Sequence, residues 1–236
     1  MPEPWTIPRM LLRERASIWR RGARIIVPGA TGDGFMPTVE ASGGGIWINE
    51  NEEVNLRTPG HVRLWRAIEE YLAGGATPIV VPMCDRRQYP APAGFTPEAV
   101  PHSDDTPHSD GTGYAQPFVD VELDASAALR ATTADFFVLR AGDIRPGMFF
   151  SILHPTWHWR LYRIQQIVET LTGDVMTVKF GPGLREAAGT GTKIEFDTPR
   201  CLMKLPAEDA FSVSIRERRF ASPSWRFVEA GRPDLE

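Results

Sequence analysis

The feature that most constrains the fold is an alternation of apolar and polar residues with a period of two, which begins near residue 119 and continues almost to the end of the chain. In the segment 119–124, apolar residues at odd positions alternate with the carboxylates of Asp120, Glu122 and Asp124. Successive side chains of a β-strand point to opposite faces, so this segment is expected to have one buried and one solvated face. Segments 176–180 and 211–215 repeat the pattern, and turns rich in glycine and proline separate such segments. The alternation predicts an antiparallel β-barrel or β-sandwich.

A single segment has clear helical periodicity, and it favours a helix over residues 59–73. Thr58 is suited to cap this helix and Pro59 to occupy its first turn, while apolar residues recur at helical spacing from Leu64 to Leu72. An apolar strand expected at residues 78–84 follows at once, which lays the helix across a sheet. The predicted fold is therefore mainly β, of the α+β kind, with one flanking amphipathic helix.

Between this helix and the alternating region lies a long polar stretch with a doubled Pro-His-Ser-Asp unit. Its prolines, glycines and short polar side chains are typical of turns, and it has no apolar periodicity. Upstream of the helix, short strands are expected at residues 24–27 and 46–49, with Trp47 turned inward. We expect the parts on either side of the stretch to pack as one domain, in three regions: an N-terminal β segment at 1–84, a long connecting loop at 85–117 and an antiparallel β region at 118–236.

Charge and cysteine content exclude several classes of function. The net charge of −4 provides no basic field for a phosphate backbone, so tight non-specific binding of nucleic acid is not expected. Cys84 and Cys201 stand far apart in apolar runs, which is typical of reduced cysteines in a core and favours folding in a cytoplasm. No apolar stretch approaches the roughly 18 residues of a membrane span, so no membrane insertion is predicted.

Residue types that often carry catalysis are present, but their spacing does not support it. Histidine, serine and aspartate are adjacent in the doubled unit, whereas the members of a catalytic triad come from distant segments. No Gly-x-Ser-x-Gly motif and no phosphate-binding loop occurs. His154 and His158 are separated by Pro155 in a strand-like context, which leaves the loop around Asp104 and Asp110 as the better metal candidate. The sequence therefore predicts no catalytic residue, no cofactor and no metal site.

Aromatic and acidic residues leave two alternatives open. Trp157 and Trp159 are expected on one face of a strand, where their rings would stack on a sugar, although such pairs more often fill a core or an interface. Sequence spacing constrains the paired carboxylates of a glycoside hydrolase only weakly. A carbohydrate-binding module and a hydrolase thus remain as alternatives.

Three local patterns of packing and turns stand out within about residues 46–216. They are the helix Val62-Arg63-Leu64-Trp65-Arg66-Ala67 running through Gly74-Gly75 into the strand at 78–85, the turn Ser109-Asp110-Gly111-Thr112-Gly113-Tyr114, and the segments 142–150, 160–164 and 181–187. Taken together, these patterns resemble the small structural tail proteins of long-tailed bacteriophages, and within these the distal tail protein class.

The resemblance implies a tail-tube-like β domain that forms a ring, commonly a hexamer, between the tail tube and the tail tip or baseplate. The implied partners are further copies of the chain, the tail tube protein and the tail hub or baseplate proteins. Such a protein has no active site, and DNA passes through its channel without specific binding. It belongs to the virion tail, of a phage or a phage-derived particle such as a gene transfer agent, after assembly in the host bacterial cytoplasm. The alternative is a tail-tip hydrolase or a carbohydrate-binding module.

The resemblance also implies two sets of functional residues. The acidic face of the strand at 119–124 is expected to line the channel, because like charge opposes adsorption of phosphates. The long loop is expected to bury apolar and aromatic side chains against neighbouring copies. The channel-facing residues are Asp120, Glu122 and Asp124, and the interface residues are Tyr89, Phe95, His102, His108 and Tyr114.

Overall fold

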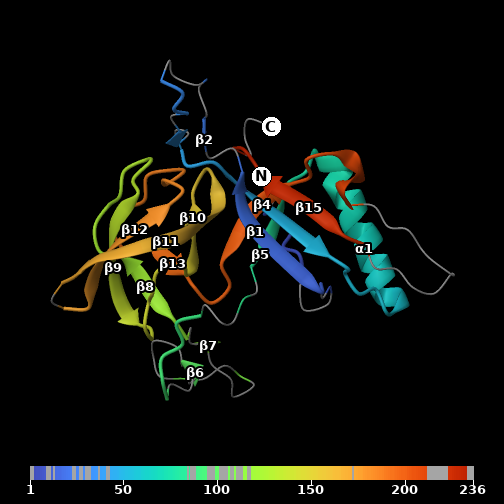
Figure 1. Cartoon of the computed structure of the whole chain (residues 1–236). Coiled ribbons are helices and arrows are strands. Elements are labelled where there is room, and N and C mark those ends of the chain that lie inside the picture. Colours follow the sequence, from blue (N-terminus) through green and yellow to red (C-terminus); the bar gives the residue numbers. More distant parts are fainter. Residues whose placement is uncertain are drawn as a thin grey trace.

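The chain forms two β bodies that pack side by side, a closed barrel and an open sheet covered by one helix (Figure 1). The fold is mainly β with antiparallel sheets, as the sequence predicts, and α1 (Pro59–Leu72) is the only α-helix in the described part of the chain. The computed structural model describes residues 3–8, 12, 14–22, 25–26, 29, 33–36, 38–40, 43–83, 85, 89–94, 99–100, 106, 109, 114–115, 118–171, 173–211 and 223–232.

The open sheet draws its strands from both ends of the chain. All its strand pairs are antiparallel, and the C-terminal strand β15 lies between β4 and β14. The expected strand at 46–49 is confirmed as part of β4, and Trp47 is fully buried. The order across the sheet is β1 (Ala16–Gly22), β4 (Ile46–Glu52), β15 (Trp225–Glu229), β14 (Arg200–Lys204) and β5 (Ile79–Pro82).

Helix α1 covers one face of this sheet, and its start agrees with the prediction. The Thr58 side chain accepts a hydrogen bond from the His61 amide at 3.2 Å, which satisfies one of the free donors of the first turn. Trp65, Ile68 and Leu72 form its buried stripe. After Leu72 the chain continues as a short 3₁₀ turn, η1 (Ala73–Gly75).

The barrel is built from one continuous stretch of the chain. Val121 and Leu123 of β8 are buried inside it, so the alternation predicted for residues 119–124 is confirmed. Aromatic rings fill the interior, where Phe150 lies 5.3–5.5 Å from Phe136, Tyr162 and Phe180 between ring centroids. Around the barrel the order is β10 (Phe149–His154), β11 (His158–Thr170), β12 (Val175–Gly181), β9 (Thr133–Arg140), β8 (Asp120–Leu123) and β13 (Lys193–Glu195).

Strands β10 and β11 form a wall that the two bodies share. Phe149 and Leu161 face the core of the sheet, whereas Phe150 and Tyr162 face the interior of the barrel. The paired segment around Phe149–Phe150 and Leu161–Tyr162 is therefore buried on both faces, and one layer of backbone separates the two cores there.

A buried ionic network joins the bodies behind this wall. Glu229, at the end of β15, accepts two hydrogen bonds from Arg185, both at 2.9 Å, and one from Arg160 at 3.4 Å. Arg160 is fully buried and also donates to the carbonyls of Ala230 and Gly231 at 2.6 Å. Because Arg160 belongs to β11, this network fixes the sheet against the barrel.

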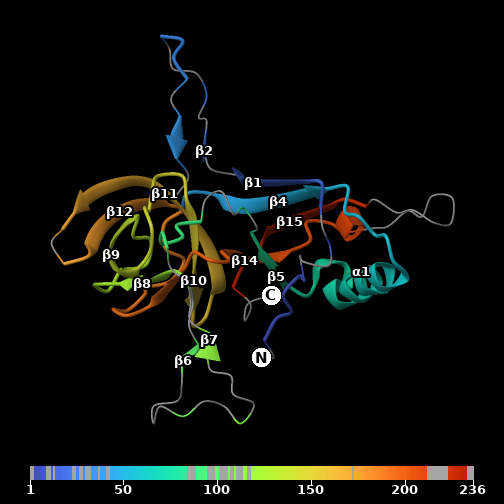
Figure 2. The same cartoon turned by 90° about the horizontal axis from the view of Figure 1, so that it is seen from below.

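Two short hairpins stand away from these bodies on opposite sides (Figures 1 and 2). One pairs β2 (Ile25–Ile26) with β3 (Val39–Glu40), and the other pairs β6 (Ala99–Val100) with β7 (Tyr114–Ala115).

The structure corrects one expected strand. Phe211 does not start a strand but ends the 3₁₀ helix η3 (Glu208–Phe211), because its ring stacks on Trp65 at 4.1 Å and on Trp225 at 5.7 Å. The rest of the expected strand at 211–215 lies outside the described residues.

Candidate functional site

The most unusual surface is the β2–β3 hairpin, which carries several apolar side chains that are exposed to solvent. It projects from the barrel side of the molecule (Figure 2). Two of its apolar residues, Phe35 and Met36, lie between the strands, and three lie in the strands themselves. Their exposed fractions range from 55% to 72%: Ile25, Ile26, Phe35, Met36 and Val39. Exposed apolar groups concentrated on one projection are characteristic of an interaction surface.

A hollow of about 510 Å³ lies on the outside of the barrel, where β13 joins β8 and β10. We call it the barrel hollow. Leu153 and Trp159 line it from the β10–β11 hairpin, and Leu153 is half exposed. The β13 ladders are short, with two residue pairs to each neighbour, so the barrel has its fewest paired residues here. The remaining lining residues are Val119, Asp120, Val121, Thr192, Lys193, Ile194, Glu195 and Asp197.

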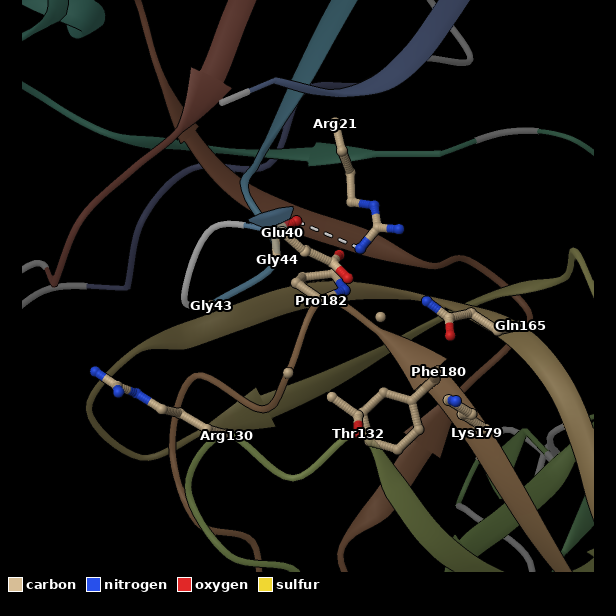
Figure 3. A pocket seen from close by; sticks show the side chains of 12 residues that line it. Arg21, Glu40, Gly43, Gly44, Arg130, Thr132, Gln165, Lys179, Phe180 and Pro182 are labelled. Atoms are coloured by element: carbon tan, nitrogen blue, oxygen red, sulfur yellow. Dashed lines mark hydrogen bonds between the residues drawn. The ribbon is translucent and has the colours of Figure 1, made fainter. Parts of the chain in front are cut away.

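A second cavity, of about 420 Å³, lies at the foot of the hairpin and has the opposite character (Figure 3). Arg21, Arg130 and Lys179 line it against one carboxylate, Glu40. Arg21 donates to the Gly44 carbonyl at 3.4 Å. A Cβ at Gly44, where φ is +73°, would lie 3.1 Å from Pro182, so this wall requires glycine. The lining of this cavity carries more cationic than anionic side chains.

The interface residues predicted in the long loop are mostly outside the described part of the chain. This holds for Phe95, His102 and His108, and for Tyr114 only its place in β7 is described. Tyr89 packs within its own chain, since its ring meets Phe118 at 6.3 Å and borders the barrel core. Its burial, together with the nearby carboxylate of Asp197, raises the pKa of Tyr89 to about 12. The interface role of these five residues remains a prediction.

The three carboxylates predicted to line a channel follow the solvated face of β8 and the turn after it. Lys193 donates to Asp120 at 2.8 Å and lies 3.1 Å from Glu122. These contacts raise the pKa of Lys193, chiefly through its hydrogen bond to Asp120, and they reduce the negative field of the stripe. Asp124 is exposed, next to the strand end.

Buried titratable groups cluster near the shared wall, where they serve the packing. His154 Nε2 lies 2.8 Å from the Tyr162 hydroxyl, which also accepts from the Arg185 amide at 3.2 Å. Burial lowers the pKa of His154 to about 4, so its imidazole is neutral at pH 7. Burial raises the pKa of the Cys201 thiol, which makes it a poor nucleophile.

Among the residues that the structure describes, no group of three or more histidine, cysteine, aspartate or glutamate side chains is arranged to hold a metal ion. Asp104 and Asp110 lie outside the described residues. His154 and His158 face each other across the β10–β11 hairpin, and His154 is engaged with Tyr162.

The two tryptophans considered for sugar stacking do not share a strand face. Trp157 lies in the turn before β11, whereas Trp159 lies in the strand. Arg200 covers the ring of Trp159 at 4.5 Å, and Arg160 covers that of Trp157 at 5.0 Å. A sugar would have to compete with these cations for the same ring faces.

Sequence reasoning missed the projecting hairpin as a functional surface. Its apolar residues occur as two adjacent pairs, Ile25-Ile26 and Phe35-Met36, between glycine-containing turns. Such pairs are equally typical of a short buried strand. The sequence does contain one signal. Only a few residues separate the glycine-containing segments at 29–34 and 42–45, so the chain between them is too short to form an element that buries Phe35 and Met36.

No protein-family model and no curated protein sequence matches the chain. In the described part of the structure, the helices are too short or too polar to cross a membrane.

Proposed function

We propose that the chain is a structural component of a bacteriophage tail, or of a phage-derived particle, of the distal tail protein class. Copies of the chain form a closed ring, commonly a hexamer, between the tail tube and the tail tip or baseplate, and DNA passes through the ring. The protein performs no catalysis in this role. Its place is the tail of the virion, after assembly in the host cytoplasm.

The projecting apolar hairpin is the observation that carries this proposal. Full burial of a large apolar side chain contributes about 1.5–3 kcal/mol, so five half-exposed ones would add roughly 5–10 kcal/mol at an interface. Association costs about 4–15 kcal/mol in lost translational and rotational freedom. A single contact through the hairpin is therefore marginal. A closed ring, in which every copy makes two such contacts, is the arrangement that makes it stable.

The fold supports the same role. The resemblance to distal tail proteins implies a β domain with one flanking helix, and the chain has a closed barrel with acidic residues on its solvated face and one helix, which packs on the adjoining sheet. Asp124 is the channel-facing residue with the greatest exposure, and Asp120 and Glu122 would contribute through a surface that Lys193 partly neutralises.

The test is the mass of the purified chain by light scattering over a range of concentrations, followed by negative-stain imaging of the largest species. We expect a ring-sized oligomer with a central hole. A monomer at every concentration would overturn the proposal, and assays for peptidoglycan turnover and for tryptophan quenching by glycans would then take precedence.

A deletion tests the interface that the resemblance assigns to the long loop. Removing residues 96–113 is expected to abolish the ring and to leave a folded monomer, because the body strands on either side of the loop are untouched. An unchanged oligomer would remove the loop residues from the interface without affecting the proposal for the ring itself.

A further inference from the structure

We propose that the tip of the β2–β3 hairpin of one copy docks into the barrel hollow of the next copy of the same chain. This inference rests on the ring assembly proposed above, and it assigns the two surfaces that meet. Phe35 and Met36 are the residues that enter the hollow, and Leu153 and Trp159 receive them.

The hairpin tip and the barrel hollow match chemically. Phe35 and Met36 expose apolar side chains at the tip, and the surface of the barrel hollow is mainly apolar as well. The other cavity is lined by Arg21, Arg130 and Lys179, so an apolar tip finds no partner there. With about 510 Å³, the hollow is comparable with sites that enclose a small molecule, which leaves room for side chains from the tip.

The ladder between β10 and β13 ends at the barrel hollow. It consists of the pairs Ser151–Glu195 and Ile152–Ile194, and in the described part of the chain no pair continues it at Leu153. The Leu153 side chain is 49% exposed beside these pairs, so an apolar side chain docked on it would remove apolar surface from water.

Position is a further argument for this docking. The hairpin lies on one side of the barrel, and β8, which borders the hollow, lies on the other side in both views (Figures 1 and 2). A two-fold contact uses the same patch on both copies, whereas a projection and its receptor on opposite sides of the barrel favour a head-to-tail contact. Such a contact closes into a ring when the rotation between copies allows it.

The test uses two variants of the full chain and their mixture. The hairpin variant carries Ile26→Asp and Met36→Asp, and the hollow variant carries Leu153→Asp. All three positions are solvated, so the fold is expected to persist, which circular dichroism and thermal unfolding would verify. Leu129→Asp is the matched control, since Leu129 is 57% exposed and lines neither surface.

Each variant alone is expected to be a monomer, with association weakened by about 100-fold or more, whereas the control assembles like the wild type. In the mixture, one intact hairpin and one intact hollow remain, on different chains. Light scattering should therefore find a dimer of the two variants and no larger species. A ring in either variant, or a mixture without dimers, overturns the docking while leaving the proposed ring intact. A monomeric wild type overturns both.

A cross-link gives a second readout that does not depend on weakened binding. With Cys84 replaced by serine and Cys201 buried, Met36→Cys and Leu153→Cys would be the only accessible thiols among the described residues. Mixed single-cysteine chains are expected to form a disulfide between copies on mild oxidation. Chains with Leu129→Cys in place of Leu153→Cys should not, and equal cross-linking of both would refute the assigned contact.

Discussion

The barrel and the sheet differ in where their strands come from in the chain and in which side chains fill their cores. The barrel takes its strands from a continuous stretch, residues 120–195, and fills its interior with phenylalanine and tyrosine. The sheet takes strands from residue 16 to residue 229, and its core holds three fully buried tryptophans. These are Trp47, Trp65 and Trp225. The barrel is closed and self-contained, whereas the sheet depends on α1 and on the shared wall.

This difference identifies the contacts that hold the barrel and the sheet together. Each body has a core of its own, and the contacts between them are the β10–β11 wall and the network of Arg160, Arg185 and Glu229. No tryptophan lies in the barrel core, although Trp157 and Trp159 lie on the β10–β11 hairpin. Intrinsic fluorescence therefore reports mainly on the sheet, whereas circular dichroism reports on both bodies together.

The largest effects on the free energy of unfolding should come from removing a large aromatic side chain from either core. Trp65→Ala in the sheet and Phe150→Ala in the barrel each remove a fully buried ring, and each should lower the free energy of unfolding by about 3–5 kcal/mol. Urea unfolding followed by fluorescence and by circular dichroism should shift together in both variants, since the shared wall couples the bodies. Separate transitions in Phe150→Ala would show that the bodies are independent.

Loss of the buried ionic network should have the next largest effect, because this network couples the unfolding of the sheet to that of the barrel. Glu229→Gln leaves Arg160 and Arg185 buried without their carboxylate, which should cost about 3 kcal/mol and separate the two transitions. Glu50→Gln is the control, because Glu50 pairs with the half-exposed Arg20 and Arg226 at the surface. Its loss should cost less than about 1 kcal/mol. Equal effects of the two substitutions would contradict the structural role of the buried network.

Acid should weaken the barrel side through His154. In the unfolded chain this imidazole binds a proton near pH 6.5, whereas in the folded protein its pKa is about 4, so the unfolded state takes up the proton first. The contribution of His154 to the free energy of unfolding is therefore fully present above pH 6.5. It should fall by about 1.4 kcal/mol per pH unit as the pH drops toward 4.

His154→Gln should flatten the stability profile between about pH 6.5 and 5, where thermal unfolding is most informative. It should not abolish the slope, because burial also lowers the pKa of His158 in the same direction. Arg160 and Glu186 face His154 and remain charged in this range, since the pKa of Glu186 is itself lowered. An unaltered profile would assign the acid sensitivity to other groups.

The smallest effect concerns the helix that only the sheet possesses. Thr58→Ala removes the hydrogen bond to the His61 amide and should lower stability by about 1 kcal/mol, whereas Thr58→Ser should keep it. Thermal unfolding of the two variants measures this difference. If the fluorescence midpoint and the circular dichroism midpoint both move, the sheet and barrel unfold together.

Local patterns made part of this fold predictable. Helix α1 follows from Thr58, Pro59 and an apolar stripe, and strand β8 follows from strict alternation, because each of these signals lies within a few residues. The sheet was not predictable in the same way. Its order depends on pairs such as β15 with β4, whose residues are far apart in the chain, and spacing within a segment contains no information about such partners.

The candidate surfaces show the same limit. Arg160 and Glu229 are 69 residues apart, so nothing in either neighbourhood indicates that they meet. The exposure of Phe35 and Met36 depends on the hairpin leaving the body, which periodicity does not encode. The acidic alternation at 119–124 was visible in the sequence, but its neutralisation by Lys193 was not, since the partner comes from a distant strand.

The position of β15 inside the sheet sets an order of folding during synthesis at the ribosome. The barrel strands have all been made once Glu195 has been translated, whereas β4 must wait for Trp225–Glu229, which is made after the whole barrel. Domains generally fold in the order in which they emerge, but here the barrel in the middle can finish before the sheet that begins earlier in the chain. Until Trp225–Glu229 has been made, the edge of β4 that pairs with β15 lacks this partner strand, so the sheet is open to wrong pairing for longer than the barrel.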